Sequence, residues 1–256
     1  MIRGEMTRKP LGHGWPRPDG PDRATFYQHL ARYEFALEQL EGGERILDAG
    51  CGTGYGTALL AKRGRYALGL DRSEAAIEYA REHYARTNLS YALMDAQQMA
   101  VAAASFDVVV SFEVYEQFKQ PEAFLRECCR VLRPGGKLML STANRETHEL
   151  HVETPYIRDE FTVELLDRRT LMAALQRHFA SVEMYGQRRK GSRLYGALRA
   201  IDVFNLRLRL FSRARRERLQ QTMGVAAEPR TQVEACVFSR HQLRQANSLV
   251  AICQKK

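Results

Sequence analysis

The sequence predicts an α/β protein whose largely parallel β-sheet is covered by helices on both faces. Between residues 45 and 187, short runs of branched apolar residues alternate with stretches of helical periodicity. Runs such as Val108–Val110 do not alternate apolar and polar residues, as strands with one solvent-exposed face do. With 256 residues, 45% of them hydrophobic, the chain can bury the core of one large domain. No apolar run approaches the ~18 residues of a transmembrane helix.

The elements follow in a regular order. Residues 22–40 place apolar side chains at helical spacing, and Gly42–Gly43 end that pattern. Five strands are then predicted, at 45–48, 66–71, 89–95, 106–113 and 137–144. Helices are predicted between them, at 53–63, 73–86 and 121–132, the last ending at the turn Arg133–Gly136. Asp167 is predicted to cap a helix that runs to Phe179. Strands at 180–187 and 248–254 complete the pattern.

Two segments fall outside this rhythm. Residues 1–21 are rich in glycine and proline and lack the apolar stretch of a secretory signal, so we expect a flexible N-terminal arm. Residues 188–245 are too many for a hairpin turn, so we expect an insertion with helices of its own. Residues 22–187 and 246–256 then form the main domain.

The net charge of +9 is concentrated near the C-terminus. Residues 186–256 carry 16 lysines and arginines against four acidic residues, most densely at Arg213–Arg218. Apolar residues at helical spacing over 198–211 predict an amphipathic basic helix. Its cations can be solvated, can bind an acidic small molecule or RNA, or can lie on an anionic membrane surface.

The five cysteines form no CxxC pair and no zinc spacing, which favours reduced thiols in the cytoplasm. His148 and His151 lie close together in sequence, but no third ligand accompanies them. We therefore predict no metal site.

The stretch ILDAGCGTGYG joins the first predicted strand to a helix. Gly50, Gly52 and Gly54 allow close backbone approach to a ligand at the helix N-terminus, and such a loop alone would also fit a dinucleotide. Asp48 disfavours a phosphate and can bind an amino group. Asp71 ends the second strand, where a carboxylate can accept both hydroxyls of a ribose.

With LDAGCGTGYG, GLDRS, YALMDAQQM, FDVVVSFEVYEQF, RVLRPGG and LSTAN in order, the sequence resembles class I S-adenosylmethionine-dependent methyltransferases. The resemblance covers about residues 25–187 and the last strand. It implies a doubly wound seven-stranded sheet of order 3-2-1-4-5-7-6, with strand 7 antiparallel and the helical insertion before it. S-adenosyl-L-methionine would be the methyl donor.

The same resemblance implies a donor site at the carboxyl ends of the strands. The three glycines would line the methionine part, beside Asp48. Asp71 and the following Arg72 would lie at the ribose, and Asp95 with Ala96 at the adenine. Glu113 would close the pocket, and Arg32 would lie near the donor carboxylate.

For the acceptor, the resemblance favours a small or glycan-like molecule methylated on oxygen, with the basic insertion as a lid over it. The family often has Glu-His where this chain has Glu116-Gln117, so the candidates for the general base are Glu113, Glu116, His148, His151 or a tyrosine. We favour Glu116 and the two histidines. No Pro-Pro-aromatic or Pro-Cys motif of nucleic-acid base methylation is present. The alternative is a methyltransferase homologue that binds RNA through its basic segment.

Overall fold

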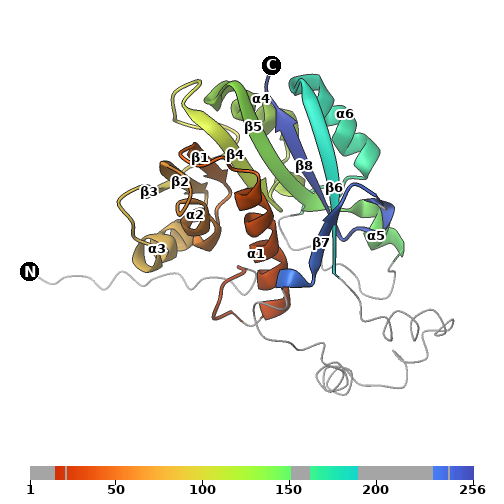
Figure 1. Cartoon of the computed structure of the whole chain (residues 1–256), viewed down its shortest axis with the longest axis horizontal. Helices are drawn as coiled ribbons and strands as arrows, with labels where there is room; N and C mark the ends of the chain where they lie inside the picture. Colours follow the sequence, from red (N-terminus) through yellow and green to blue (C-terminus); the bar gives the residue numbers. More distant parts are fainter. Residues whose placement is uncertain (1–14, 21, 151–161, 190–232, 242) are drawn as a thin grey trace, which may run out of the picture.

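The computed structural model describes residues 15–20, 22–150, 162–189, 233–241 and 243–256 (Figure 1). For residues 148–150 only the backbone is described. Most of the predicted basic insertion, Arg213–Arg218 included, lies outside these ranges. No helix within them is long and apolar enough to cross a membrane.

Within the described residues, eight strands form one sheet of order β3-β2-β1-β4-β5-β8-β6-β7. They are β1 (Arg45–Ala49), β2 (Tyr66–Asp71), β3 (Leu89–Leu93), β4 (Phe106–Phe112), β5 (Leu132–Ala143), β6 (Ser181–Arg189), β7 (Cys236–Ser239) and β8 (Ser248–Gln254). The first five strands pair in parallel, and β8 is antiparallel to both β5 and β6. Since β8 is the expected seventh strand, the predicted order is confirmed, with β7 as an additional edge strand.

The helices are α1 (Arg23–Glu38), α2 (Tyr55–Leu60), α3 (Glu74–His83), α4 (Pro121–Val131), α5 (Arg145–Leu150) and α6 (Arg168–His178), with short 3₁₀ turns η1 (Tyr115–Gln117) and η2 (Leu243–Gln245). Asp167 caps α6 as predicted, because its carboxylate accepts a hydrogen bond from the Thr170 amide at 2.8 Å.

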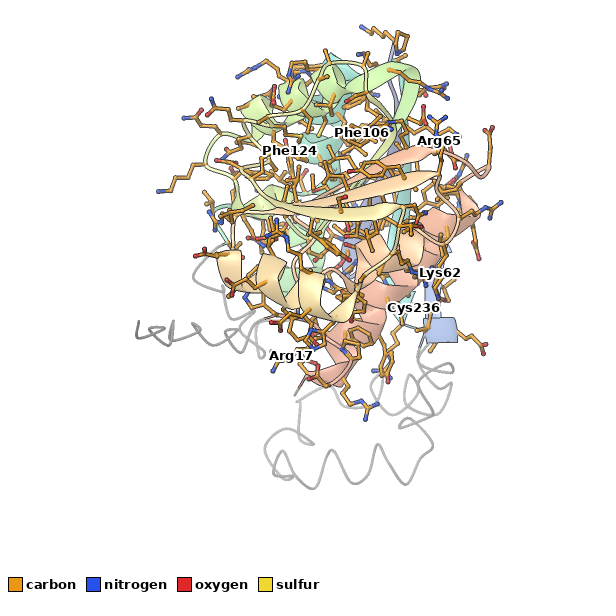
Figure 2. The ribbon with its side chains drawn as sticks, turned by 90° about the vertical axis from the view of Figure 1, so that its left-hand side faces the viewer. Arg17, Lys62, Arg65, Phe106, Phe124 and Cys236 are labelled. Atoms are coloured by element: carbon orange, nitrogen blue, oxygen red, sulfur yellow. The ribbon has the colours of Figure 1, made fainter. Side chains whose placement is uncertain are left out.

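Helices cover both faces of the sheet, which accounts for the continuous apolar strands (Figure 1). In β5, Met139 packs with residues of α1, α2 and α3, whereas Leu138 and Leu140 pack with α4 and α6. All three side chains are fully buried. Phe106 and Phe124, labelled in Figure 2, belong to the core on the α4 and α6 side.

One local prediction needs correction. The Arg133–Gly136 turn is part of β5, which begins at Leu132 directly after α4 and pairs there with Phe106 of β4. The pairing shifts register after Phe106, and Gly135 adopts a φ of +73°. The predicted turn is therefore an irregularity within β5 and does not precede the strand.

An additional strand that the sequence analysis does not predict, β7, lies inside the stretch 188–245. It pairs antiparallel with β6. Phe238 of β7 stacks on Phe35 of α1, with ring centroids 4.4 Å apart. This aromatic contact gives a four-residue edge strand an apolar surface to pack on.

The buried side chain of Arg32 ties α1 to the sheet. Its Nη1 donates to Gln187 Oε1 of β6 at 2.7 Å and to Ser248 Oγ of β8 at 3.2 Å. The same nitrogen lies 3.4 Å from Glu113 Oε1, directly after β4. Only 1% of Arg32 is exposed, so its charge depends on these partners for compensation.

We predict that Arg32→Met lowers the free energy of unfolding by about 3 kcal/mol, because it leaves the Glu113 carboxylate without its cation. The double variant Arg32→Met/Glu113→Gln should recover part of this loss. Urea denaturation of both, beside the exposed control Arg126→Met, measures the effect. A double variant as unstable as the sum of the two singles would contradict the role assigned to this pair.

Candidate functional site

The glycine loop between β1 and α2 has a left-handed backbone at Gly50, Gly52 and Gly54, with φ of +84°, +53° and +82°. A Cβ on Gly50 would lie 2.4 Å from Val114, and one on Gly54 would lie 2.5 Å from Ala80. These two glycines are therefore required by packing within the protein. Their predicted role in the close approach of a ligand stays a prediction.

Gly52 faces a different neighbour. A Cβ at this position would lie 3.1 Å from ring atoms of Trp15, and the backbone amide of Gly52 donates to Asp71 Oδ2 at 2.9 Å. Asp71 Oδ1 accepts from the Ser73 amide at 2.8 Å. The structure thus brings the glycine loop and Asp71 together, as the sequence predicts.

Asp71 is 6% exposed, and burial raises the pKa of its carboxyl above the ordinary value. The two backbone amides that donate to it counteract this rise by stabilising the charged form. Each carboxylate oxygen has a second lone pair, so both can accept a further hydrogen bond.

Asp48 is fully buried beneath the loop. The Tyr33 hydroxyl donates to both of its oxygens at 3.2 Å, and Thr57 Oγ1 donates to Oδ2 at 2.6 Å. Burial raises the pKa of Asp48 to about 7, although these hydrogen bonds oppose the shift. The sequence predicts that this carboxylate can bind an amino group, but it does not identify the two hydroxyls that hold it.

Glu113 follows β4 with a φ of +56°, unusual for a residue with a side chain. Ser141 Oγ donates to its Oε1 at 2.8 Å, and Gln117 Nε2 donates to its backbone carbonyl at 3.0 Å. Together with Arg32, these contacts fix the Glu113 carboxylate at the end of β4.

Glu116, in η1, is only 4% exposed. Thr142 Oγ1 donates to its Oε2 at 2.9 Å. Burial, followed by the charge of Glu113, raises the pKa of Glu116 to about 8. At neutral pH this carboxyl is therefore largely protonated and becomes a base only as the pH rises.

The predicted adenine side lies after β3. Asp95 is exposed and accepts a hydrogen bond from the Gln97 amide at 2.8 Å, whereas Ala96 is buried. Arg72, directly after β2, is exposed. No described contact links these three residues directly to the glycine loop.

The histidine candidates lie largely outside the described residues. The backbone of His148 belongs to α5, directly after β5, but its side chain is not described, and His151 lies in the undescribed range. Among the side chains that are described, no group of three or more His, Cys, Asp and Glu residues could hold a metal ion.

Sequence reasoning missed three contributors to this site. Trp15 and Pro16 belong to the segment predicted as a flexible arm, yet Thr53 Oγ1 donates to the Pro16 carbonyl at 2.9 Å. Thr57 of α2 is the third, because its hydroxyl donates to Asp48. Tyr33 also donates to Asp48, and the resemblance already places the pair Arg32–Tyr33 near the donor carboxylate. Contacts of this kind depend on tertiary packing and cannot be predicted from the spacing of residues in the sequence.

Residues 47–140 match a family model described as "Methyltransferase domain". Over 127 residues the chain is 39% identical to a "Probable S-adenosylmethionine-dependent methyltransferase" of Mycolicibacterium smegmatis, covering 48% of this chain and 49% of that protein. It is 31% identical over 138 residues to a "Ubiquinone biosynthesis O-methyltransferase" of Coxiella burnetii, covering 53% and 59%. The chain thus matches about half the length of these curated relatives.

A solved structure from Thermotoga maritima, described as "SAM-dependent methyltransferase, possible histamine N-methyltransferase", shares the fold. The TM-score is 0.61 at 18% identity, over 91% of each chain. The family match over residues 47–140 and the similar sequences around it identify a methyltransferase domain in this part of the chain, and the solved structure shows that the chain has the same fold.

Proposed function

We propose that this protein transfers a methyl group from S-adenosyl-L-methionine to a hydroxyl of a small or glycan-like acceptor. The observation that carries the proposal is Asp71, whose carboxylate lies beside the glycine loop at the carboxyl ends of β1 and β2. Doubly wound sheets bind their ligands at this edge. The similarity to a protein named as an O-methyltransferase supports oxygen as the methylated atom.

The residues present fit such a donor. Asp71 keeps lone pairs for two ribose hydroxyls, and Gly52 presents no side chain on the face that lies against Trp15. We assign Asp48, Arg32 and Glu113 to the methionine end, and Arg72, Asp95 and Ala96 to the nucleoside end. Gly50 and Gly54 shape the loop between them.

When bound, the donor supplies an activated methyl group that is transferred by in-line displacement. The protein therefore contributes mainly by positioning the reactants and excluding water. A hydroxyl acceptor also requires a base, and we assign this role to Glu116 or to a loop histidine, His148 or His151.

Cationic side chains support an acidic group on the acceptor. A pocket of about 420 Å³ is lined by residues of α6, of η2 and of the loop between β7 and η2, among them Arg168, Arg240, His241 and Arg244. Glu146 and Glu183 offset part of this charge. The basic segment 188–245 would extend the positive surface as a lid.

Labelled methyl transfer from S-adenosylmethionine to pools of sugars, phenols, amines and tRNA tests the function. Incorporation into a hydroxyl compound is expected. Incorporation into tRNA, with retention on RNA that falls steeply as salt increases, would instead support the RNA-binding alternative.

A cytoplasmic location is consistent with five cysteines that form no disulfide.

Asp71→Ala should weaken S-adenosylhomocysteine binding about ten- to hundred-fold, through loss of charge-assisted hydrogen bonds to the ribose. Calorimetric titration measures the dissociation constant. Glu78→Ala, an exposed carboxylate on α3, is the control and should bind as the wild type does. Wild-type affinity of Asp71→Ala would exclude the assignment.

The pH dependence of kcat distinguishes the candidate bases. If Glu116 is the base, kcat should rise with pH through about 8, because its carboxyl is neutral below that pKa. Glu116→Gln should then lower kcat by about 10²–10⁴-fold. A loop histidine would place the rise near ~6.5, and His148→Ala or His151→Ala would remove it. If all three variants stay within threefold of the wild type, proximity alone accounts for catalysis.

A further inference from the structure

The segment formed by residues 15–20, here called the N-terminal strap, is fastened to the protein at two points. At one end, Thr53 of the glycine loop donates through Oγ1 to the Pro16 carbonyl at 2.9 Å. At the other end, the Tyr79 hydroxyl of α3 lies 3.4 Å from Asp19 Oδ1, to which it donates. Figure 2 shows Arg17, between these anchors, close to α3 at the lower edge of the molecule.

The two anchors lie on either side of Asp71. One is the loop whose Gly52 amide donates to Asp71. The other is α3, whose N-cap, Ser73, donates its amide to the same carboxylate. The strap therefore joins the two elements that hold Asp71, a residue that is only 6% exposed.

Trp15 occupies the critical position on the strap. Its ring lies against Gly52, so closely that a Cβ there would be 3.1 Å from Cε3 and Cζ3. An added Cβ on Gly52 would meet the ring of Trp15 in the strap, whereas one on Gly50 or Gly54 would meet side chains of the main domain. Any ligand that uses Gly52 and Asp71 must pass beneath Trp15 or displace it.

We propose that Trp15 is a donor-binding residue: the strap opens to admit S-adenosylmethionine and closes with the indole ring over it. This inference rests on the proposed function. A tryptophan face attracts a cation such as the donor's sulfonium, and the ring excludes water from the polar groups beneath it. Thr53 and Tyr79 hold the strap closed by hydrogen bonds and act as positioning residues.

The chain offers a direct probe, because Trp15 is its single tryptophan. Titration of the full chain with S-adenosylhomocysteine should give a saturable change in tryptophan emission, with the midpoint at the calorimetric dissociation constant. Trp15→Ala should raise that constant about tenfold, through loss of the aromatic surface. Trp15→Phe should restore affinity to within about threefold, because it keeps a ring.

Tyr79→Phe removes only the hydroxyl that binds Asp19, so it should speed donor dissociation in stopped-flow fluorescence while Trp15 still reports binding. Glu78→Gln, an exposed change on the same helix, is the matched control. The thermal midpoints of the ligand-free variants should stay close to that of the wild type, which separates a binding effect from loss of fold.

The outcomes separate this inference from the function on which it rests. If the wild type binds S-adenosylhomocysteine but its emission does not change and Trp15→Ala binds equally well, the strap has no part in the site and the proposed function stands. If Trp15→Ala binds more tightly, the ring blocks the donor instead of covering it, and the inference is wrong. If the wild type does not bind, both fail.

Discussion

The buried guanidinium of Arg32 is the constraint on which the arrangement of the sheet and the site depends. It joins α1 to Glu113 after β4, to β6 and to β8, three segments that are distant in sequence. An arginine that is 1% exposed is tolerated only if its partners are correctly placed. The Glu113 end of the proposed donor site therefore has these contacts only when the N-terminal helix and the C-terminal strands have both packed. Folding and site assembly are therefore coupled.

The contact between Arg32 and Glu113 makes the surroundings of two nearby glutamates different. Glu113 has a cation and the Ser141 hydroxyl beside it. Glu116, one helical turn further along, has burial and the negative charge of Glu113 against its ionisation. Two carboxyl groups three residues apart thus have different surroundings, and only Glu116 lies almost wholly inside the protein. One is suited to a fixed polar wall and the other to proton exchange.

The sequence predicted the parallel strands and their order well, because strands buried on both faces are continuous apolar runs and the motifs between them follow in a typical order. It missed β7, since Cys236–Ser239 is short and becomes a strand only by pairing with β6 and packing on Phe35. Asp71 and Gly52 were correctly brought together by the prediction. The hydroxyls that hold Asp48, the burial of Glu116 and the place of Trp15 depend on distant packing and were not predictable from spacing.

The glycine loop has a consequence for how such chains diverge. Gly50 and Gly54 have no room for a Cβ against Val114 and Ala80, whether or not a ligand is present. A descendant that had lost its donor would still be under selection to keep both, simply to fold. Persistence of these two glycines in a relative is therefore evidence for the architecture alone. Drift at Gly52, where an added Cβ would meet only the ring of Trp15, would be the earlier sign that the ancestral chemistry has been abandoned.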